Sequence, residues 1–148
     1  MKKASLQINP EPVKIQTYQF SEVVVKANPN FDSTGTSQGS RVKISTNIHQ
    51  GENKELYQIE LRIMVLVEEG ENVPYEIVMT CYAVVSADPD TDYSTDQNNV
   101  FFASVIHFLY SACREMAANI TSRGPWPKFI LPFIKIESQA EDIEIQFA

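Results

Sequence analysis

Four aspartates, three of them at alternate positions, form the first group whose type and spacing could bind a ligand. They are Asp88, Asp90, Asp92 and Asp96. The first three match the opening positions of a calcium-binding loop, which also needs glycine at its sixth position and glutamate at its twelfth. Tyr93 and Asn99 stand there instead. We therefore interpret these aspartates as the solvated, acidic start of a helix, whose amino end favours negative charge.

Catalysis would require pairs of reactive side chains held close together. His107 and Cys113 are six residues apart on a predicted helix, about 600° of rotation, so they point roughly 120° away from each other. His49 lies on the polar face of a predicted strand, and neither histidine has a cysteine at ligand spacing. Glu60 and Glu76 could share one face of neighbouring strands as a carboxylate pair, but we favour a solvated sheet face.

Sequence motifs for nucleotide or metal chemistry are absent from the chain. It contains no glycine-rich phosphate loop, no nucleophile elbow and no zinc-protease helix. We therefore expect a protein that is not an enzyme and that uses no cofactor and no metal ion.

Negative charge is concentrated in the middle of the sequence. No lysine or arginine occurs between Arg62 and Arg114, whereas acidic residues recur there. The formal net charge of −7 argues against sequence-independent binding to nucleic acid or to an anionic membrane. The charge either serves solubility or steers a basic partner. The candidates for partner binding are Glu60, Glu68, Glu69, Glu71 and Glu76.

Length and composition predict one globular domain over residues 1–148. The 148 residues are 43% hydrophobic and 21% charged, which is typical of a chain with a single core. No long apolar stretch follows the two lysines near the start, and no window resembles a membrane span. Two cysteines are too few for a disulfide framework and suit a reducing compartment. We expect a cytoplasmic protein without direct membrane insertion.

Apolar periodicity places a strand-rich part before a helix-rich part. The ranges 13–27, 41–49, 56–67 and 73–85 are strand-like. The apolar positions of the first range change parity near residues 16–17, which requires a bulge or a twist. A short glycine-containing turn joins the last two ranges into an antiparallel hairpin. The predicted class is α+β, with a four-stranded antiparallel sheet, solvated on one face and packed on one long helix.

The predicted helix has a firm apolar stripe and a clear end. Its stripe contains Phe102, Ile106, Leu109, Cys113, Met116 and Ile120. Ser94 and Gln97 have the spacing of a capping box at its start. Gly124 is predicted to end the helix in the left-handed conformation, and Pro125 cannot continue it. Residues 137–148 are predicted to be extended or irregular, with a short terminal helix as the alternative.

Two further expectations follow from these elements. Cys81 points into the predicted core and Cys113 lies on the helix stripe that faces it, so both should be buried free thiols. Phe101, Phe108 and Tyr110 extend the apolar surface of the helix beyond one stripe. One sheet face cannot cover all of it, so we expect a homo-oligomer, either a dimer or a tetramer.

The end of the predicted helix resembles the SecB family of export chaperones. The segment "SACREMAANITSRGPWPKFILPF" has the family's Arg-Glu pair, followed by Arg-Gly, an aromatic-Pro pair and a Leu/Pro-rich stretch. These residues are Arg114, Glu115, Arg123, Gly124, Trp126, Pro127, Leu131 and Pro132. The four predicted strands also match the family's order. The chain departs from the family where "FILPFIKI" replaces the usual "NLAPVNF" and where a second carboxy-terminal helix has no counterpart.

The resemblance implies an oligomeric chaperone that holds unfolded or preprotein polypeptides in apolar grooves without nucleotide or metal. It also implies a link to protein transport through a basic, translocase-type partner. Adaptable binding of unfolded chains favours aromatic and flexible apolar surface. The candidate client-binding residues are Tyr18, Phe20, Phe31, Trp126, Phe129 and Phe133, with Met64 and Met79 as weaker candidates. For each of them, core packing is the alternative.

Two other hypotheses remain open. The chain could be a SecB-fold interaction module or oligomeric scaffold that binds one dedicated partner, such as an antitoxin-like client, without an export role. It could also be a small-molecule enzyme with its site between sheet and helix, since an alternating sheet with one long helix occurs in cone-shaped ligand-binding folds.

Overall fold

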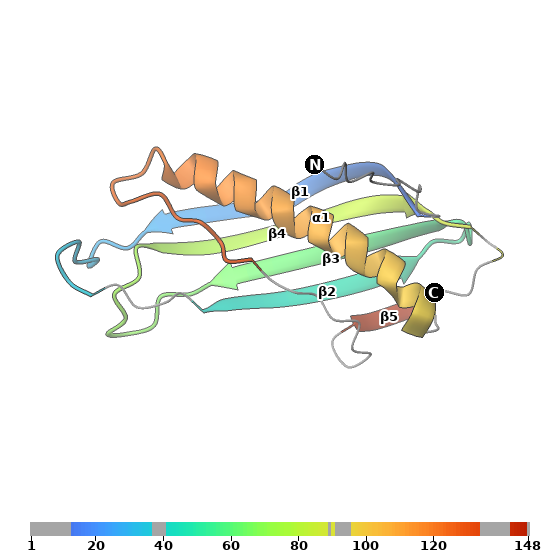
Figure 1. Cartoon of the computed structure of the whole chain (residues 1–148), viewed down its shortest axis with the longest axis horizontal. Helices are drawn as coiled ribbons and strands as arrows, with labels where there is room; N and C mark the ends of the chain where they lie inside the picture. Colours follow the sequence, from blue (N-terminus) through green and yellow to red (C-terminus); the bar gives the residue numbers. More distant parts are fainter. Residues whose placement is uncertain (1–12, 37–40, 89, 91–95, 134–142, 148) are drawn as a thin grey trace, which may run out of the picture.

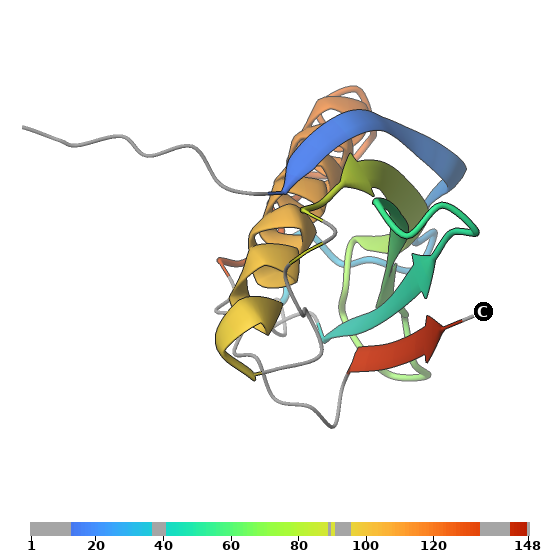
Figure 2. The same ribbon diagram turned by 90° about the vertical axis from the view of Figure 1, so that its right-hand side faces the viewer.

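The computed structural model describes residues 13–36, 41–88, 90, 96–133 and 143–147. Its elements in chain order are β1 (Lys14–Ala27), β2 (Val42–Gln50), β3 (Leu56–Val65), β4 (Tyr75–Ser86), α1 (Asp96–Thr121) and β5 (Ile143–Phe147). The strands form one sheet in the order β1-β4-β3-β2-β5 (Figure 1). The first four strands pair antiparallel, and α1 crosses one face of the curved sheet (Figure 2). The predicted α+β class is confirmed.

Two bulges keep the apolar residues of β1 on the helix side of the sheet. The register with β4 shifts between Ile15 and Thr17 and again between Phe20 and Glu22. The first shift confirms the bulge predicted from the change of parity, while the second was not predicted. Each extra residue reverses the faces of the residues after it. Tyr18 and Phe20 consequently share a face with the buried residues of β4.

The core lies between α1 and the alternating inner residues of β3 and β4. The inner positions of both strands are buried along their whole length, whereas the outer positions are half-buried or exposed. On α1, Phe102, Ile106, Leu109 and Cys113 are almost completely buried against this face. The helical spacing of three and four therefore identified the buried stripe correctly.

The last strand described, β5, lies beside β2. Its five residues pair parallel with β2, with Ile145 opposite Ile48 and Phe147 opposite Gln50. The expectation of extended structure is confirmed for these residues, and a terminal helix is wrong there. Ser94, the first residue of the predicted capping box, and Asp92 of the aspartate-rich segment lie outside the described residues.

The end of α1 differs from the prediction at Gly124. The N–H of Gly124 donates to the carbonyl of Thr121 at 3.0 Å, which closes the last turn. Among the described residues only Gly70 has positive φ, at 83°, so the left-handed helix end predicted at Gly124 is wrong. A Cβ atom at this position would instead overlap the hydroxyl of Tyr75 and lie 3.0 Å from its Cζ. Close packing against β4 is the reason for glycine here.

Both cysteines are buried free thiols, as predicted. The Sγ atoms of Cys81 and Cys113 are 3.5 Å apart. Tyr110, by contrast, is not part of an open apolar face of α1. It is buried, and its hydroxyl donates to the carbonyl of Pro132 at 2.6 Å.

Candidate functional site

An apolar groove lies where the loop between β1 and β2 approaches the segment that follows α1. It encloses about 330 Å³. Its lining residues are Phe31, Ser33, Gly35, Pro74, Pro127, Lys128, Phe129 and Ile130. Pro125 and Pro127 prevent the chain after α1 from continuing a helix and remove backbone donors. The segment is therefore irregular and presents its side chains to the groove.

Trp126 closes one side of this region. Its ring centroid is 5.2 Å from that of Phe31, in an edge-to-face arrangement. Its Nε1–H donates to the carbonyl of Asn28 at 3.0 Å, and its backbone N–H donates to the hydroxyl of Tyr75 at 3.1 Å. Tyr75 is buried and its hydroxyl also lies 3.4 Å from the carbonyl of Thr121. Trp126 is thereby fixed to the loop after β1, to β4 and to the end of α1.

The chain returns along α1 after Trp126, and we call residues 127–133 the return segment (Figure 1). The N–H of Phe129 donates to Oγ1 of Thr121 at 2.9 Å. The Nε–H of Arg114 donates to the carbonyl of Leu131 at 2.8 Å, and Leu131 is completely buried. Arg114, the arginine of the Arg-Glu pair, therefore attaches the return segment to α1.

The return segment keeps two large apolar side chains exposed despite these attachments. Ile130 is 61% exposed and Phe133 is 88% exposed. The guanidinium carbon of Arg114 lies 4.1 Å from the centroid of the Phe133 ring. Exposed apolar side chains beside a groove mark a surface suited to a polypeptide partner.

The six aromatic residues predicted to bind clients do not form one surface. Phe31, Trp126 and Phe129 come together at the groove, while Phe133 lies further along the return segment. Tyr18 packs against Phe108 of α1, with ring centroids 5.0 Å apart.

Of the remaining candidates, only Met79 is a core residue. Phe20 is partly buried against the core, and Met79 is buried within it. Met64 is half-buried on β3. The sequence did not indicate that Pro74, Tyr75 and Ile130 lie at the groove, because only the fold brings the start of β4 next to the end of α1.

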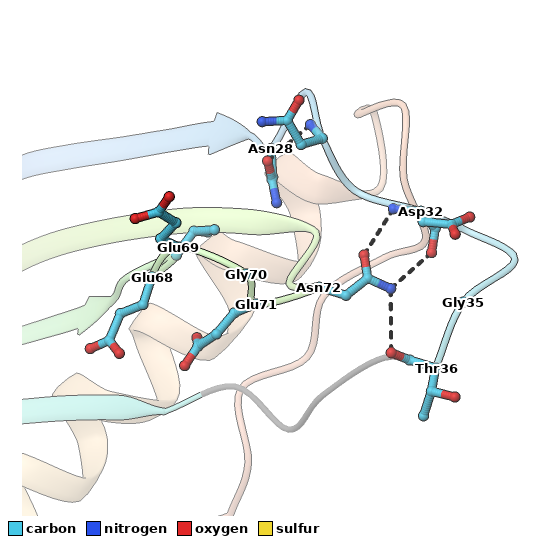
Figure 3. A pocket seen from close by; sticks show the side chains of 11 residues that line it. Asn28, Asp32, Gly35, Thr36, Glu68, Glu69, Gly70, Glu71 and Asn72 are labelled. Atoms are coloured by element: carbon cyan, nitrogen blue, oxygen red, sulfur yellow. Dashed lines mark hydrogen bonds between the residues drawn. The ribbon is translucent and has the colours of Figure 1, made fainter.

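A second, larger hollow, which we call the polar hollow, is lined mostly by asparagine, aspartate and glutamate residues (Figure 3). It encloses about 590 Å³ between the loop after β1 and the turn between β3 and β4. Asn72 holds the loop: its Oδ1 accepts from the N–H of Asp32 at 2.8 Å, and its Nδ2 donates to the carbonyl of Asp32 at 2.9 Å. Hydrogen bonds from the hydroxyl and the N–H of Thr34 lower the pKa of Asp32.

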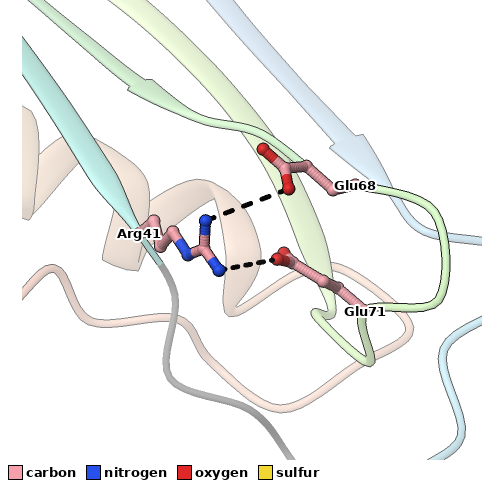
Figure 4. Close-up of polar contacts among 3 residues, drawn as sticks. All are labelled: Arg41, Glu68 and Glu71. Atoms are coloured by element: carbon pink, nitrogen blue, oxygen red, sulfur yellow. Dashed lines mark ion pairs between the residues drawn. The ribbon is translucent and has the colours of Figure 1, made fainter.

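Three of the five acidic candidates for partner binding lie at this hollow. They are Glu68, Glu69 and Glu71, on the turn between β3 and β4. Arg41 lies between two of them, with Nη1 3.9 Å from Glu68 and Nη2 3.7 Å from Glu71 (Figure 4). The stretch without cations in the sequence is thus partly neutralised by an arginine from another segment. The turn nevertheless keeps an excess of negative charge.

Glu60 and Glu76 do not form a carboxylate pair. Glu60 lies opposite Tyr82 of β4, and Tyr82 is six residues from Glu76 on the same strand. At a rise of about 3.4 Å per residue, the two glutamates are roughly 20 Å apart along the sheet. Within the described ranges, no group of three His, Cys, Asp or Glu side chains is arranged to hold a metal ion.

No helix in the described part of the chain is long and apolar enough to cross a membrane. Comparison of the sequence with family models and with curated proteins gives no match.

Known structures share the fold. A SecB-like chaperone of Mycobacterium tuberculosis, solved in complex with a peptide from an antitoxin, superposes with a TM-score of 0.67 over 84% of this chain and 92% of that one. The sequences are 10% identical. A Streptococcus agalactiae protein of unknown function gives a TM-score of 0.51, also at 10% identity, over 82% of this chain and 97% of that one. The chain thus has the SecB-like chaperone fold that its helix-end residues suggested.

Proposed function

We propose that the chain is a non-enzymatic chaperone that binds unfolded or extended polypeptides at the groove beside Trp126. The observation that carries this proposal is the groove itself, where Phe31 meets Pro127 and Phe129 from a segment almost one hundred residues away in the sequence. A structure with the same fold was solved with a polypeptide bound, which supports a polypeptide as the ligand.

The groove has the properties that binding of diverse chains requires. An unfolded client offers apolar side chains and unpaired backbone groups, and aromatic anchors supply much of the contact energy in such interfaces. The groove has room for single apolar side chains, Ile130 is an exposed part of its lining, and Phe133 extends the apolar surface beyond it. The fixed position of Trp126 reduces the entropy lost on binding.

Suppression of aggregation tests this function. Purified protein is added at near-stoichiometric ratio to several unrelated unfolded polypeptides, and light scattering is followed. Suppression with many clients supports a general chaperone, whereas binding of one polypeptide only supports the dedicated interaction module. Failure with every client contradicts polypeptide binding and leaves a small-molecule enzyme between sheet and helix as the remaining hypothesis.

A matched pair of variants locates the site. Ile130→Thr removes an exposed apolar side chain from the groove, while Val84→Thr makes the same kind of change on the outer face of β4. We expect several-fold weaker client binding for Ile130→Thr and little change for Val84→Thr. Equal binding by both variants would place the client elsewhere. Fluorescence of Trp126, the single tryptophan, should change as client saturates the wild-type protein.

We also propose that the chain forms a homo-oligomer through β1 and α1. Tyr18 and Phe108 are 46% and 40% exposed and pack against each other, and Ile15 and Val23 extend this apolar surface along β1. Within the described residues, β1 pairs with β4 alone, so its other edge is open. A second copy of the chain would cover both the apolar side chains and the open edge.

The acidic turn completes the proposal as a steering surface. Glu68, Glu69 and Glu71 would attract basic clients or a basic translocase-type partner in the cytoplasm, whereas Glu60 and Glu76 belong to β3 and β4 and not to the turn. Charge of this kind mainly raises the association rate and makes it depend on salt. An export role requires that such a partner binds, which a pull-down with and without the acidic residues tests.

A further inference from the structure

Two thiols meet in the core where α1 crosses β4. The Sγ atoms of Cys81 on β4 and Cys113 on α1 lie 3.5 Å apart, and both residues are completely buried. They are the two cysteines of the sequence. The proposed binding of polypeptides uses neither of them, so the contact needs a separate explanation.

We propose that Cys81 and Cys113 are a redox site, in which hydrogen peroxide or a similarly small, uncharged oxidant closes a reversible disulfide between α1 and β4. A disulfide requires sulfur atoms about 2.05 Å apart. The present separation of 3.5 Å leaves an approach of roughly 1.5 Å for the two sulfur atoms. Burial excludes bulky or charged oxidants, which is why the oxidant must be small.

The hydrogen bond between the two thiols makes one sulfur a better nucleophile than the other. The hydrogen bond with Cys113 raises the pKa of Cys81, and burial raises it further. The same hydrogen bond lowers the pKa of Cys113, because a donated S–H stabilises the neighbouring thiolate. Since the thiolate is the reactive form, the sulfur that accepts the S–H attacks the oxidant and the donor is the resolving thiol, and the contact allows either cysteine to be the donor.

The reaction balances in two steps. With Cys113 as the attacking sulfur, its Sγ attacks one oxygen of hydrogen peroxide, the O–O bond breaks, and the product is a sulfenic acid on Cys113 and one water. Cys81 Sγ then attacks Cys113 Sγ, the S–O bond breaks, and the oxygen leaves as a second water with the thiol proton of Cys81. Two thiols lose two electrons and two protons, and one peroxide is reduced to two waters.

The disulfide would join α1 to β4 close to the point where the return segment is bound to α1. Cys113 immediately precedes Arg114, which donates to the carbonyl of Leu131. The bond would close a loop spanning 32 positions of the chain. Restricting the unfolded chain in this way should raise the melting temperature of the oxidised protein by about 5 °C or more.

The test uses the reduced full-length protein under native conditions. It is treated with hydrogen peroxide, quenched with catalase and unfolded in urea with iodoacetamide, and its intact mass is measured. We expect a loss of about 2 Da without alkylation, reversed by dithiothreitol, because disulfide formation removes two hydrogens. Peptide mapping should find Cys81 joined to Cys113. In Cys81→Ser, Cys113 should stop at the sulfenic acid, which dimedone traps.

The wild-type protein decides the outcome even if the variant fails to fold. Two alkylated cysteines after peroxide treatment, with native circular dichroism retained, would overturn the proposal. So would a disulfide that forms only when urea is present during oxidation. An oxidised protein that melts below the reduced protein would also overturn it, because the native contact would then not accommodate the bond.

Discussion

Tyr75 of β4 occupies the space into which any side chain at position 124 would project. Its hydroxyl overlaps the place of a Cβ atom on Gly124, and its Cε1 atom lies 3.1 Å from that place. The same hydroxyl contacts the backbone of Trp126 and Thr121. The contact between Tyr75 and the end of α1 therefore requires glycine at position 124 and also sets the position of the groove.

We expect Gly124→Ala to lower the free energy of unfolding by about 1–3 kcal/mol, as overpacking of a close contact does. Gly124→Asn should cost at least as much, measured by urea denaturation. At Gly70, where φ is 83°, asparagine should be tolerated better than alanine. If the asparagine variant were also more stable than the alanine variant at position 124, the need for glycine there would come from backbone conformation and not from Tyr75.

Arg114 should hold the return segment in place. Arg114→Ala removes the hydrogen bond to Leu131 and the contact with Phe133, and we expect a loss of about 1–2 kcal/mol. Hydrogen exchange should become faster in residues 129–133. Arg123→Ala, which removes an exposed arginine just beyond the helix, is the control. Unchanged exchange in the Arg114 variant would contradict the attachment.

The loop beside the polar hollow should respond to acid through Asp32. The hydrogen bond from the hydroxyl of Thr34 is the main cause that lowers the pKa of Asp32 in the folded protein. The ionised carboxylate therefore stabilises the loop at pH values above the unfolded-state pKa. This stabilisation is lost as the pH falls through the folded-state pKa. Thr34→Val should raise the pKa of Asp32. Titration of the carboxyl carbon by NMR measures the change, and an unshifted midpoint would contradict the assignment.

The oligomer should depend on the aromatic contact between β1 and α1. Multi-angle light scattering of the wild-type protein should give a multiple of 16.7 kDa. Phe108→Ser should shift the mass towards the monomer, because it removes apolar surface from the proposed interface. Phe133→Ser, which changes a more exposed phenylalanine elsewhere, should not. A wild-type monomer across micromolar concentrations would contradict the oligomer.

The acidic turn should control how fast a basic client arrives. Glu69→Lys reverses an exposed charge at the turn, and we expect a several-fold slower association that depends less on salt. Dissociation should change little. Glu115→Lys makes the same change on α1 and is the control. Stopped-flow fluorescence with a lysine-rich unfolded polypeptide measures both rates, and equal effects of the two variants would assign the steering to net charge alone.

Local periodicity determined much of the architecture. Alternation placed the inner residues of β3 and β4, spacing of three and four identified the stripe of α1, and the change of parity in β1 located its first bulge. These features depend on which face each side chain takes, and the sequence records that directly. The burial of Cys81 and Cys113 followed from the same patterns.

The tertiary structure alone decided which distant residues meet. It placed Arg41 between Glu68 and Glu71 and set Tyr75 against Gly124. It brought Phe31 to Phe129, while Phe20 packs partly buried against the core away from them. It also placed Cys81 and Cys113 in contact with each other. Such contacts depend on the crossing of α1 over the sheet and on how the loops close. Periodicity gives the face on which a residue lies, but it contains no information about the partner across the interface.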